Sequence, residues 1–357
     1  MPDSITDAAH TKSLATSFIT DSITPQRHSR NIWQNPQNTV DIFLEDARSR
    51  RRIIAKKVTT GFRFIRGGKT IGGLDSGITT LVSHQALRAS RRPQVMRHYF
   101  AASDVPCLPA DTYHVSQFTV AQRNLPTGDM PVVVRPASPR VRSGATTTLV
   151  QRENFTDAWE TAAQACHALK PLERFIEIQE YRQGLQLRIY VVGEEAVAAL
   201  VRIPFHVVGD GLLTIRELVE NELQEWRKCN YLSRREPTLP DVITRLGSIP
   251  DDVPLPGEVR LESQVSDFGR GEGISIDVTD QLDAELAELA VDTMWAFPGL
   301  AATAVDILAP SLENSSDAVV VGIDPTADLG EFLYPTFGRS RRVTLRILDH
   351  MIATARR

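Results

Sequence analysis

The chain has 357 residues, of which 42% are hydrophobic and 24% charged, and its formal net charge at pH 7 is −4. This composition is ordinary for a globular protein, and the length allows two or three packed units. A nucleic-acid-binding domain is normally basic, so the charge balance argues against a nucleic-acid partner, and the runs Arg48–Arg52 and Arg339–Arg342 are interpreted as solvated faces or phosphate contacts.

No apolar run approaches the ~18 residues that a membrane-spanning helix needs. The first residues, MPDSITDAAHTK, lack the basic start and apolar centre of a signal peptide. The three cysteines, Cys107, Cys166 and Cys229, have neither metal-binding nor redox spacing. These features predict a cytoplasmic protein with reduced thiols and no membrane partner.

The first quarter of the chain contains two segments of different composition. Residues 1–38 are rich in Ser, Thr, Asn, Gln and His and lack hydrophobic periodicity, which predicts a flexible N-terminal arm. Apolar residues then recur at helical spacing over Thr39–Ser49, and the segment GFRFIRGGKTIGG predicts two strands joined by a Gly-Gly turn. Residues 39–90 are therefore expected to form a small N-terminal α/β domain.

The next segment, residues 91–175, is expected to be a central unit. Residues 92–103 predict a helix, and Met130–Arg135 predict a strand buried on both faces. An amphipathic helix is predicted to start near Asn154, because apolar residues fall on one face of the helical pattern from there.

Residues 176–357 are expected to form a C-terminal unit that opens with strands over 176–206. A helix over Ile215–Arg227 follows, with Thr214 placed to cap it, and the five prolines of residues 235–257 predict a loop. The remaining predicted elements are the helix Asp280–Trp295, the strands Ala304–Leu308 and Val319–Ile323, and a last amphipathic helix around Ile347–Ile352.

The stretch Gln179–Leu218 carries a family resemblance. It opens with the acidic and aromatic pair Glu180 and Tyr181, turns at Gly184 and runs into an alternating strand. That order resembles the ATP-grasp superfamily, specifically the branch containing cyanophycin synthetase and the glutathione-forming ligases. The resemblance implies an α/β (α+β) fold in which two β-rich lobes close over ATP, preceded here by the small N-terminal domain.

The same resemblance implies the cations that hold the phosphates of ATP. Arg97 lies in the helix before VPCLP, and Arg135 ends the strand VVVRP, each where the family has lysine. Guanidinium keeps the charge and adds bidentate phosphate geometry, whereas the alternative for each is a surface cation. The loop ASPRVRSGATTTLV matches the glycine-rich phosphate loop, which implies contacts from Ser143 and Gly144.

The segment IEIQEYRQG matches the hinge that contacts adenine in the family, through Gln179, Glu180 and Tyr181. Gln186 takes the place of the acidic residue that usually holds the ribose hydroxyls. Arg188 follows on the same strand and is expected to meet a phosphate or a substrate carboxylate, because an arginine buried in a strand without a partner is costly.

Two aspartates are implied as magnesium ligands. The strand TAVDILAP resembles the first metal-binding strand of the family and gives Asp306. In VVVGIDPTADLG, Gly322 stands where the family has a metal-bridging glutamate, and Asp324 stands where it has asparagine. Residues two apart on a strand point to the same face, so we expect Asp324 to lie toward Asp306 and both to hold Mg²⁺.

The segment LPGEVRLESQVSDFGRGEGISIDVTDQ resembles a substrate-side segment of cyanophycin synthetase. The match implies that Arg260 stabilises an oxyanion during the reaction, with Arg270 as a second candidate. The alternative for this segment is an exposed hairpin loop. His206 is interpreted as a structural residue, because a lone histidine is more often a satisfied part of the packing.

Taken with ATP and Mg²⁺, the resemblance implies an ATP-grasp ligase that joins a small carboxylate to an amine through an acyl-phosphate, releasing ADP. The substrate would be a small amino acid or a peptide-like compound. Two alternatives stay open: an ATP-grasp kinase that phosphorylates a small-molecule hydroxyl, and a nucleotide-binding paralogue without turnover. A homodimer is usual in this fold.

Overall fold

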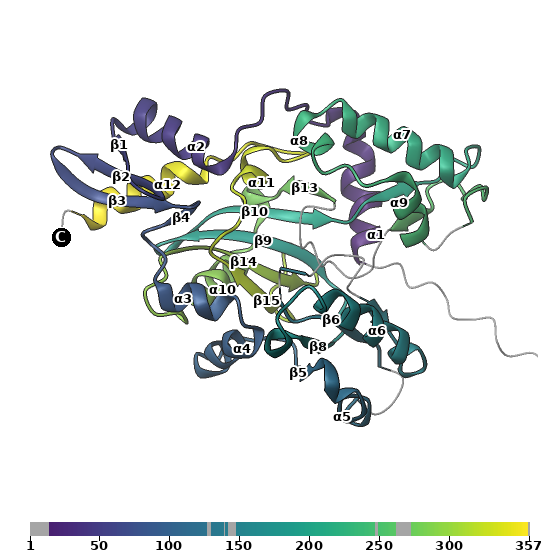
Figure 1. Ribbon diagram of the computed structural model, residues 1–357. Helices are drawn as coiled ribbons and strands as arrows, with labels where there is room; N and C mark the ends of the chain where they lie inside the picture. Colours follow the sequence, from purple (N-terminus) through teal and green to yellow (C-terminus); the bar gives the residue numbers. More distant parts are fainter. Residues whose placement is uncertain are drawn as a thin grey trace, which may run out of the picture.

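The computed structural model describes residues 14–126, 130–138, 140–141, 148–246, 249–261 and 273–355. A five-stranded antiparallel sheet of order β13-β10-β9-β14-β15 lies at the centre (Figure 1). Its strands are β9 (Leu185–Val192), β10 (Glu195–Ile203), β13 (Ile274–Asp277), β14 (Ala302–Ala309) and β15 (Val319–Asp324).

Every residue of the central strand β9 is buried, because helices cover both faces of the sheet. Leu187 and Ile189 point to the face covered by α10 (Ala284–Trp295). Tyr190 and Val192 point to the opposite face, which is covered at that end by α12 (Val343–Thr354). The predicted C-terminal strands and both predicted helices are therefore confirmed.

The face of the central sheet that α12 covers is apolar at one end of β9 and polar at the other. Since side chains alternate across a strand, Gln186 and Arg188 share the face of Tyr190 and Val192. The apolar end of this face belongs to a hydrophobic core with α12, whereas the other end carries buried polar and charged side chains. That polar half is where the candidate site lies.

A four-stranded antiparallel sheet of order β5-β8-β6-β7 forms the second lobe. Its core contains Phe155, Trp159 and Ile176 and is separate from those of the central sheet. The strand predicted over 130–135 and the helix predicted from Asn154 are both present. The elements are β5 (Ala110–His114), α5 (Phe118–Arg123), β6 (Val132–Pro136), β7 (Thr148–Val150), α6 (Phe155–Cys166) and β8 (Phe175–Glu180).

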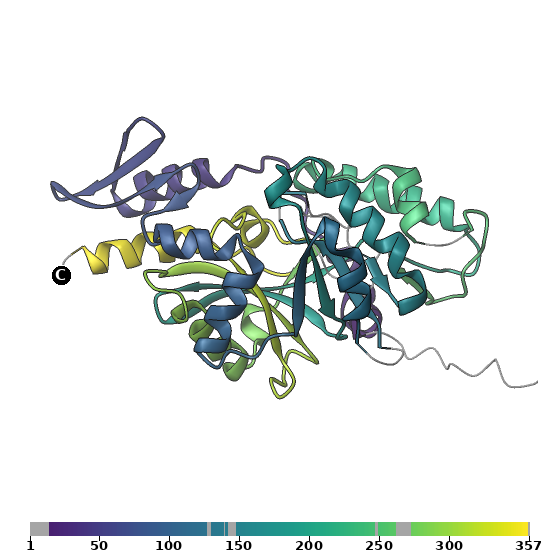
Figure 2. The same ribbon diagram turned by 60° about the horizontal axis from the view of Figure 1, so that its bottom comes forward.

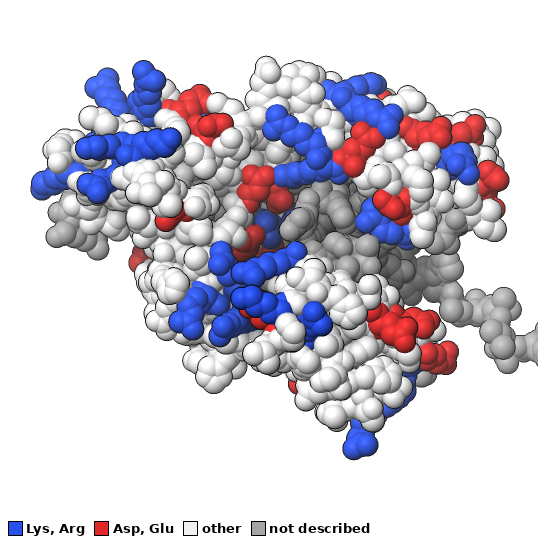
Figure 3. Space-filling model, in the orientation of Figure 1, with Lys and Arg blue, Asp and Glu red and all other residues white. Residues whose placement is uncertain are grey.

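A small sheet, β1-β2-β3-β4, forms a third unit, and the predicted hairpin is confirmed. It projects at the left of Figures 1 and 2, where α12 runs beside it. Lys and Arg side chains gather over β1–β3 (Figure 3), and Arg51 ties this lobe to α12 through Asp349. The elements are α2 (Thr39–Glu45), β1 (Ile54–Lys57), β2 (Gly61–Arg66), β3 (Lys69–Asp75) and β4 (Ile78–Thr79). The helices α3 (His84–Ser90) and α4 (Pro93–Ala102) come next in the chain, and their buried residues belong to the core of the central sheet.

The expectation of a flexible arm is wrong for residues 14–38. Leu14–Phe18 form α1, and two short helical turns continue from it to Ser29. Ile19 and Ile23 are buried in the core of the central sheet, and Trp33 donates a hydrogen bond to the carbonyl of Pro335. Isolated apolar residues in a polar segment anchor it by tertiary packing, which sequence periodicity does not reveal.

The predicted helix over Ile215–Arg227 is present as α7, and Thr214 and Glu217 form a capping box at its start. The expected proline-rich loop is wrong for Leu239–Arg245, which form α9, because Thr238 caps the helix and Pro240 occupies its first turn. Within the described ranges, no helix is both long and apolar enough to cross a membrane. The other elements here are α8 (Asn230–Ser233), β11 (His206–Val208), β12 (Val259–Leu261) and α11 (Gly330–Leu333).

Candidate active site

A narrow cavity lies where the second lobe meets the central sheet. The hinge between β8 and β9 forms one side of it, and Leu308 and Val321 from β14 and β15 form the other. Several residues predicted to contact nucleotide therefore line a single cavity. These residues are Arg135, Gln179, Glu180, Tyr181 and Gln186.

The hinge itself is held close to the central sheet. A Cβ atom on Gly184 would lie 3.3 Å from the backbone of Ala309, so a larger residue would push the hinge away from β14. The amide of Glu180 donates to the carbonyl of Pro109, and burial raises the pKa of the Tyr181 hydroxyl. The apolar walls, Leu308 and Val321, were not singled out from the sequence because they are indistinguishable there from ordinary core residues.

Arg97 and Arg135 meet at one buried carboxylate, Glu177. Arg97 Nη1 donates to Glu177 Oε2 at 2.6 Å, and Arg135 Nη2 donates to Glu177 Oε1 at 2.8 Å. Arg135 Nη2 also donates to Gln179 Oε1 at 3.0 Å. Two cations therefore share this one buried carboxylate.

Glu177 was missed by the sequence analysis. It is 1% exposed in the middle of β8, between Ile176 and Ile178. A glutamate that interrupts a strand of apolar residues is the signal that could have found it, because such a carboxylate is stable only beside a cation.

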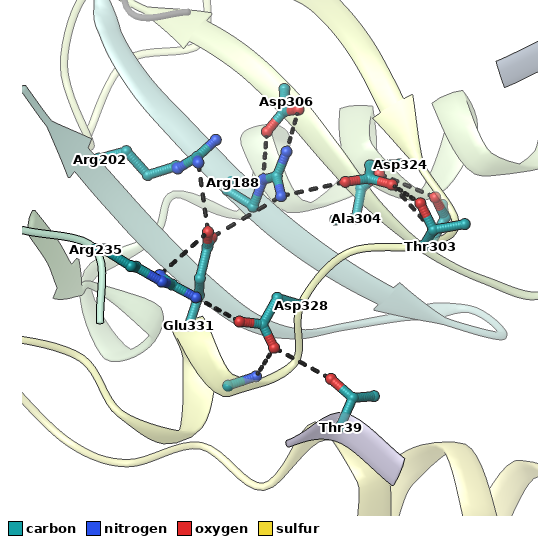
Figure 4. A network of polar contacts seen from close by, with 12 residues as sticks. Thr39, Arg188, Arg202, Arg235, Thr303, Ala304, Asp306, Asp324, Asp328 and Glu331 are labelled. Atoms are coloured by element: carbon teal, nitrogen blue, oxygen red, sulfur yellow. Dashed lines mark hydrogen bonds and ion pairs between the residues drawn. The ribbon is translucent and has the colours of Figure 1, made fainter. Parts of the chain in front are cut away.

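Arg188 joins the two predicted metal ligands (Figure 4). Its Nε and Nη2 atoms donate to the two carboxylate oxygens of Asp306 at 2.7 and 2.8 Å, and Nη1 lies 3.4 Å from Asp324 Oδ2. The strand register explains the geometry, because Arg188 lies opposite Asp306 on β14, and Asp324 lies opposite Ala304 two residues along.

Burial and neighbouring charges together set the pKa values of Arg188 and Asp306. Burial alone disfavours the charged form of Arg188, but Asp306, Glu331 and Asp324 raise its pKa well above the ordinary value. Burial would likewise raise the pKa of Asp306, yet the charge and hydrogen bonds of Arg188 lower it. Both side chains therefore stay ionised.

The network continues away from the cavity (Figure 4). Glu331, which is 7% exposed, lies 3.9 Å from Arg188 Nη1, 3.4 Å from Arg202 Nη2 and 4.0 Å from Arg235 Nη1. Arg235 in turn donates to Asp328 at 2.5 Å. Glu331 was considered from the sequence only as a possible substitute for the missing metal-bridging glutamate, whereas Arg235 was not predicted as a site residue and lay in the region expected to be a loop.

Asp306 and Asp324 offer a fit for one Mg²⁺ ion that also binds nucleotide oxygens, because such sites use one or two protein carboxylates. Asp324 is the more accessible, with a side chain that is 33% exposed against 15% for Asp306. Within the described part of the chain, no three His, Cys, Asp or Glu side chains are arranged to hold a metal by themselves. A metal here would depend on the phosphates.

Among the described residues, Arg260 was also predicted to belong to the site, but no hydrogen bond or ion pair joins it to this network. Arg260 lies on β12 opposite Val207 and pairs with Glu258 at 2.5 Å. Arg270, Ser143 and Gly144 lie outside the described residues. His206 Nδ1 is 3.0 Å from the carbonyl of Pro204, which suits the structural role predicted for it.

No protein-family model matches the chain. The glutathione biosynthesis bifunctional protein GshAB of Mannheimia succiniciproducens is 28% identical over 187 residues, which cover 49% of this chain and 24% of that protein. Cyanophycin synthetase of Synechocystis is 28% identical over 231 residues, covering 62% of this chain and 26% of the relative. The chain thus spans about a quarter of the length of these relatives.

Among solved structures, a bifunctional glutathione synthetase from Pasteurella multocida superimposes with a TM-score of 0.58 at 20% identity. The match covers 88% of this chain and 44% of the other. The expected α/β fold, with β-rich lobes meeting at one cavity, is therefore confirmed. The chain is similar in sequence to cyanophycin synthetases and to bifunctional glutathione-synthesis proteins, and this similarity supports the predicted resemblance to the ATP-grasp superfamily.

Proposed function

We propose that the chain is an ATP-dependent, ADP-forming ligase that joins a carboxylate to an amine. The carboxylate would attack the γ-phosphate to give an acyl-phosphate and ADP, and the amine would then displace phosphate to give an amide. The names of both groups of relatives support this chemistry, since one makes glutathione and the other cyanophycin. The acid would be a small amino acid or a peptide-like compound.

One observation carries the proposal. The cations Arg97 and Arg135 share Glu177 at the edge of a cavity that the hinge also lines. Gln186 lines that cavity, and Arg188 lies two residues along the same face of β9, about 7 Å away at the usual rise of a strand. The adenine slot, the phosphate cations and the carboxylates Asp306 and Asp324 are then contiguous.

Each group has a role in this arrangement. The hinge would bind adenine through its backbone, Gln186 would bind the ribose, and Arg97 and Arg135 would neutralise the phosphates by charge-assisted hydrogen bonds. Magnesium bound at Asp306 and Asp324 would supply further charge neutralisation at the phosphates. Arg188 would orient the two aspartates, and Arg260, Arg270, Ser143 and Gly144 keep their proposed substrate and phosphate roles.

The test is a set of reactions containing the protein, Mg²⁺, ATP and candidate acids and amines. We expect rapid ADP release only when both an acid and an amine are present, and a hydroxamate when hydroxylamine replaces the amine. Arg135→Gln should weaken ADP binding roughly 10- to 150-fold, because a hydrogen bond between charged groups contributes about 1.5–3 kcal/mol. Arg216→Gln, an exposed position, is the matched control. A stable phosphorylated product would instead identify a kinase.

A second candidate is a nucleotide-binding protein without turnover. Gly322 lies opposite Asp306, where the family has a metal-bridging glutamate, and Arg188 engages both oxygens of Asp306. Binding of Mg²⁺ and ATP with no ADP release across a broad panel of acids and amines would favour this candidate over the ligase.

A further inference from the structure

A second cavity, of about 570 Å³, opens on the far side of the charged network from the hinge. A volume of this size is typical of small-molecule sites. It is formed by the chain before and within α2, by the turn after α8 and by Asp328. The lining residues are Gln37, Asn38, Thr39, Val40, Asp41, Tyr231, Arg234, Arg235 and Asp328.

The acidic groups of this cavity already have donors. Asp328 accepts hydrogen bonds from Arg235, Thr39 and Tyr231 and from the amide of Gly330. Asp41 accepts from the side chain of Asn38 at 2.7 Å. A ligand amine at Asp328 would therefore have to displace an existing partner.

The two arginines of the cavity line it and supply hydrogen-bond donors that its aspartates lack. Arg234 is exposed, and no side-chain hydrogen bond or ion pair joins it to another described residue. Arg235 stacks on the ring of Tyr231, with its Cζ atom 4.4 Å from the ring centroid, which fixes the plane of the guanidinium. Two adjacent arginines, one held and one with its donors available, complement a carboxylate or a phosphate.

The cavity is also joined to the proposed reaction site. Arg235 Nη1 lies 4.0 Å from Glu331 Oε1, and Glu331 Oε2 lies 3.9 Å from Arg188 Nη1. A single carboxylate thus separates the floor of this cavity from the arginine that holds Asp306 and Asp324 (Figure 4). A small molecule bound at Arg234 and Arg235 is within reach of that region.

We propose that this cavity binds an anionic group, a carboxylate or a phosphate, that the acid substrate carries remote from its reacting carboxyl. The assignment of the ligand as substrate rests on the proposed ligase function. The site itself does not, because it depends only on the placement of Arg234 and Arg235 and on the four donors that Asp328 already has. The substrate class would be an acid with a second anionic group.

Calorimetric titration of the full chain with glutarate and, in a separate arm, with inorganic phosphate tests the site at constant ionic strength and without nucleotide. The arm with the tighter binding identifies the kind of anion. We expect Arg234→Gln to weaken binding five- to tenfold and Asp41→Asn to strengthen it two- to threefold, because the two substitutions change the charge of the cavity in opposite directions. Arg216→Gln on α7 makes the same charge change elsewhere and should stay within twofold.

The site is ruled out if neither anion binds in the millimolar range, if Arg234→Gln leaves binding unchanged, or if Arg216→Gln weakens it equally. Arg235→Gln should abolish binding, and if that variant does not fold, Arg234→Gln decides the matter, because its side chain is exposed. Titration with Mg²⁺ and ADP separates the two proposals. If the wild-type chain binds ADP but neither glutarate nor phosphate, this site alone is refuted, and if it binds an anion but not ADP, the ligase alone is refuted.

Discussion

Arg188 and Asp306 lie directly opposite each other on the neighbouring antiparallel strands β9 and β14, and the guanidinium donates to both carboxylate oxygens. Neither side chain is more than 15% exposed. Each charge is therefore stabilised in the sheet by the other, and removing one leaves the other buried without its main partner. The proposed metal ligands thus also have a structural role.

Replacing the cation tests that role. Arg188→Met should lower the free energy of unfolding by about 3–5 kcal/mol, because it leaves Asp306 ionised and buried. Urea denaturation gives the value, and adding Asp306→Leu should recover part of the loss. Arg216→Met is the matched control at an exposed position and should change stability by less than about 0.5 kcal/mol. Equal urea midpoints for Arg188→Met and the wild type would contradict the ion-pair account.

A substitution at Gly322 tests the altered metal strand. A Cβ atom there would meet the flexible end of Met96 at an ordinary 3.4 Å, and the glycine does not have a positive φ. Gly322→Ala should therefore fold and be more stable by about 0.4–1 kcal/mol, since it reduces the entropy of the unfolded chain.

The longer acidic substitution at the same position addresses metal binding. Gly322→Glu places a third carboxylate opposite Asp306, so we expect ADP to bind more tightly at a given Mg²⁺ concentration. Calorimetric titration of ADP at several Mg²⁺ concentrations measures this, with Gly322→Gln as the uncharged control of the same size. A gain in Gly322→Gln as large as in Gly322→Glu would show that charge is not the cause.

The pH dependence of stability should include a contribution from His206. Burial lowers its pKa below the ordinary 6.5, so the folded protein keeps the ring neutral where the unfolded chain binds a proton. The contribution to stability is complete above about pH 6.5 and falls as the pH drops through that value toward the folded-state pKa. The melting temperature of His206→Asn should decrease less between pH 7.5 and 5.5 than that of the wild type. His84→Asn, at an exposed position, should behave as the wild type does.

The N-terminal helical segment should be essential for stability. Ile19 is 0% exposed, and Ile19→Ala should cost about 2–5 kcal/mol through the lost burial and the cavity left behind. Ile32→Ala, at a side chain that is 56% exposed, is the matched control and should have almost no effect. Equal melting temperatures for Ile19→Ala and Ile32→Ala would contradict the packing of Ile19 and would support a flexible N-terminal arm.

Local patterns were sufficient for most elements of the fold. Thr214 indicated the start of α7, and alternating or continuous apolar runs located β6, β9, β14 and β15. These signals depend on neighbours along the chain, so one sequence is enough to find them. They failed for Ile19, whose partners are distant in sequence, and for Leu239–Arg245, where prolines outweighed a good cap.

Linear patterns predicted the α/β fold and the order in which Arg97, Arg135, Asp306 and Asp324 occur along the chain. Which of these charges meet depends on tertiary structure. Glu177 accepts hydrogen bonds from both Arg97 and Arg135, and Arg188 lies between the two aspartates, because the register of separate strands sets these pairs. Register and lobe packing fix distances between residues far apart in the chain, and a linear pattern contains no such distances.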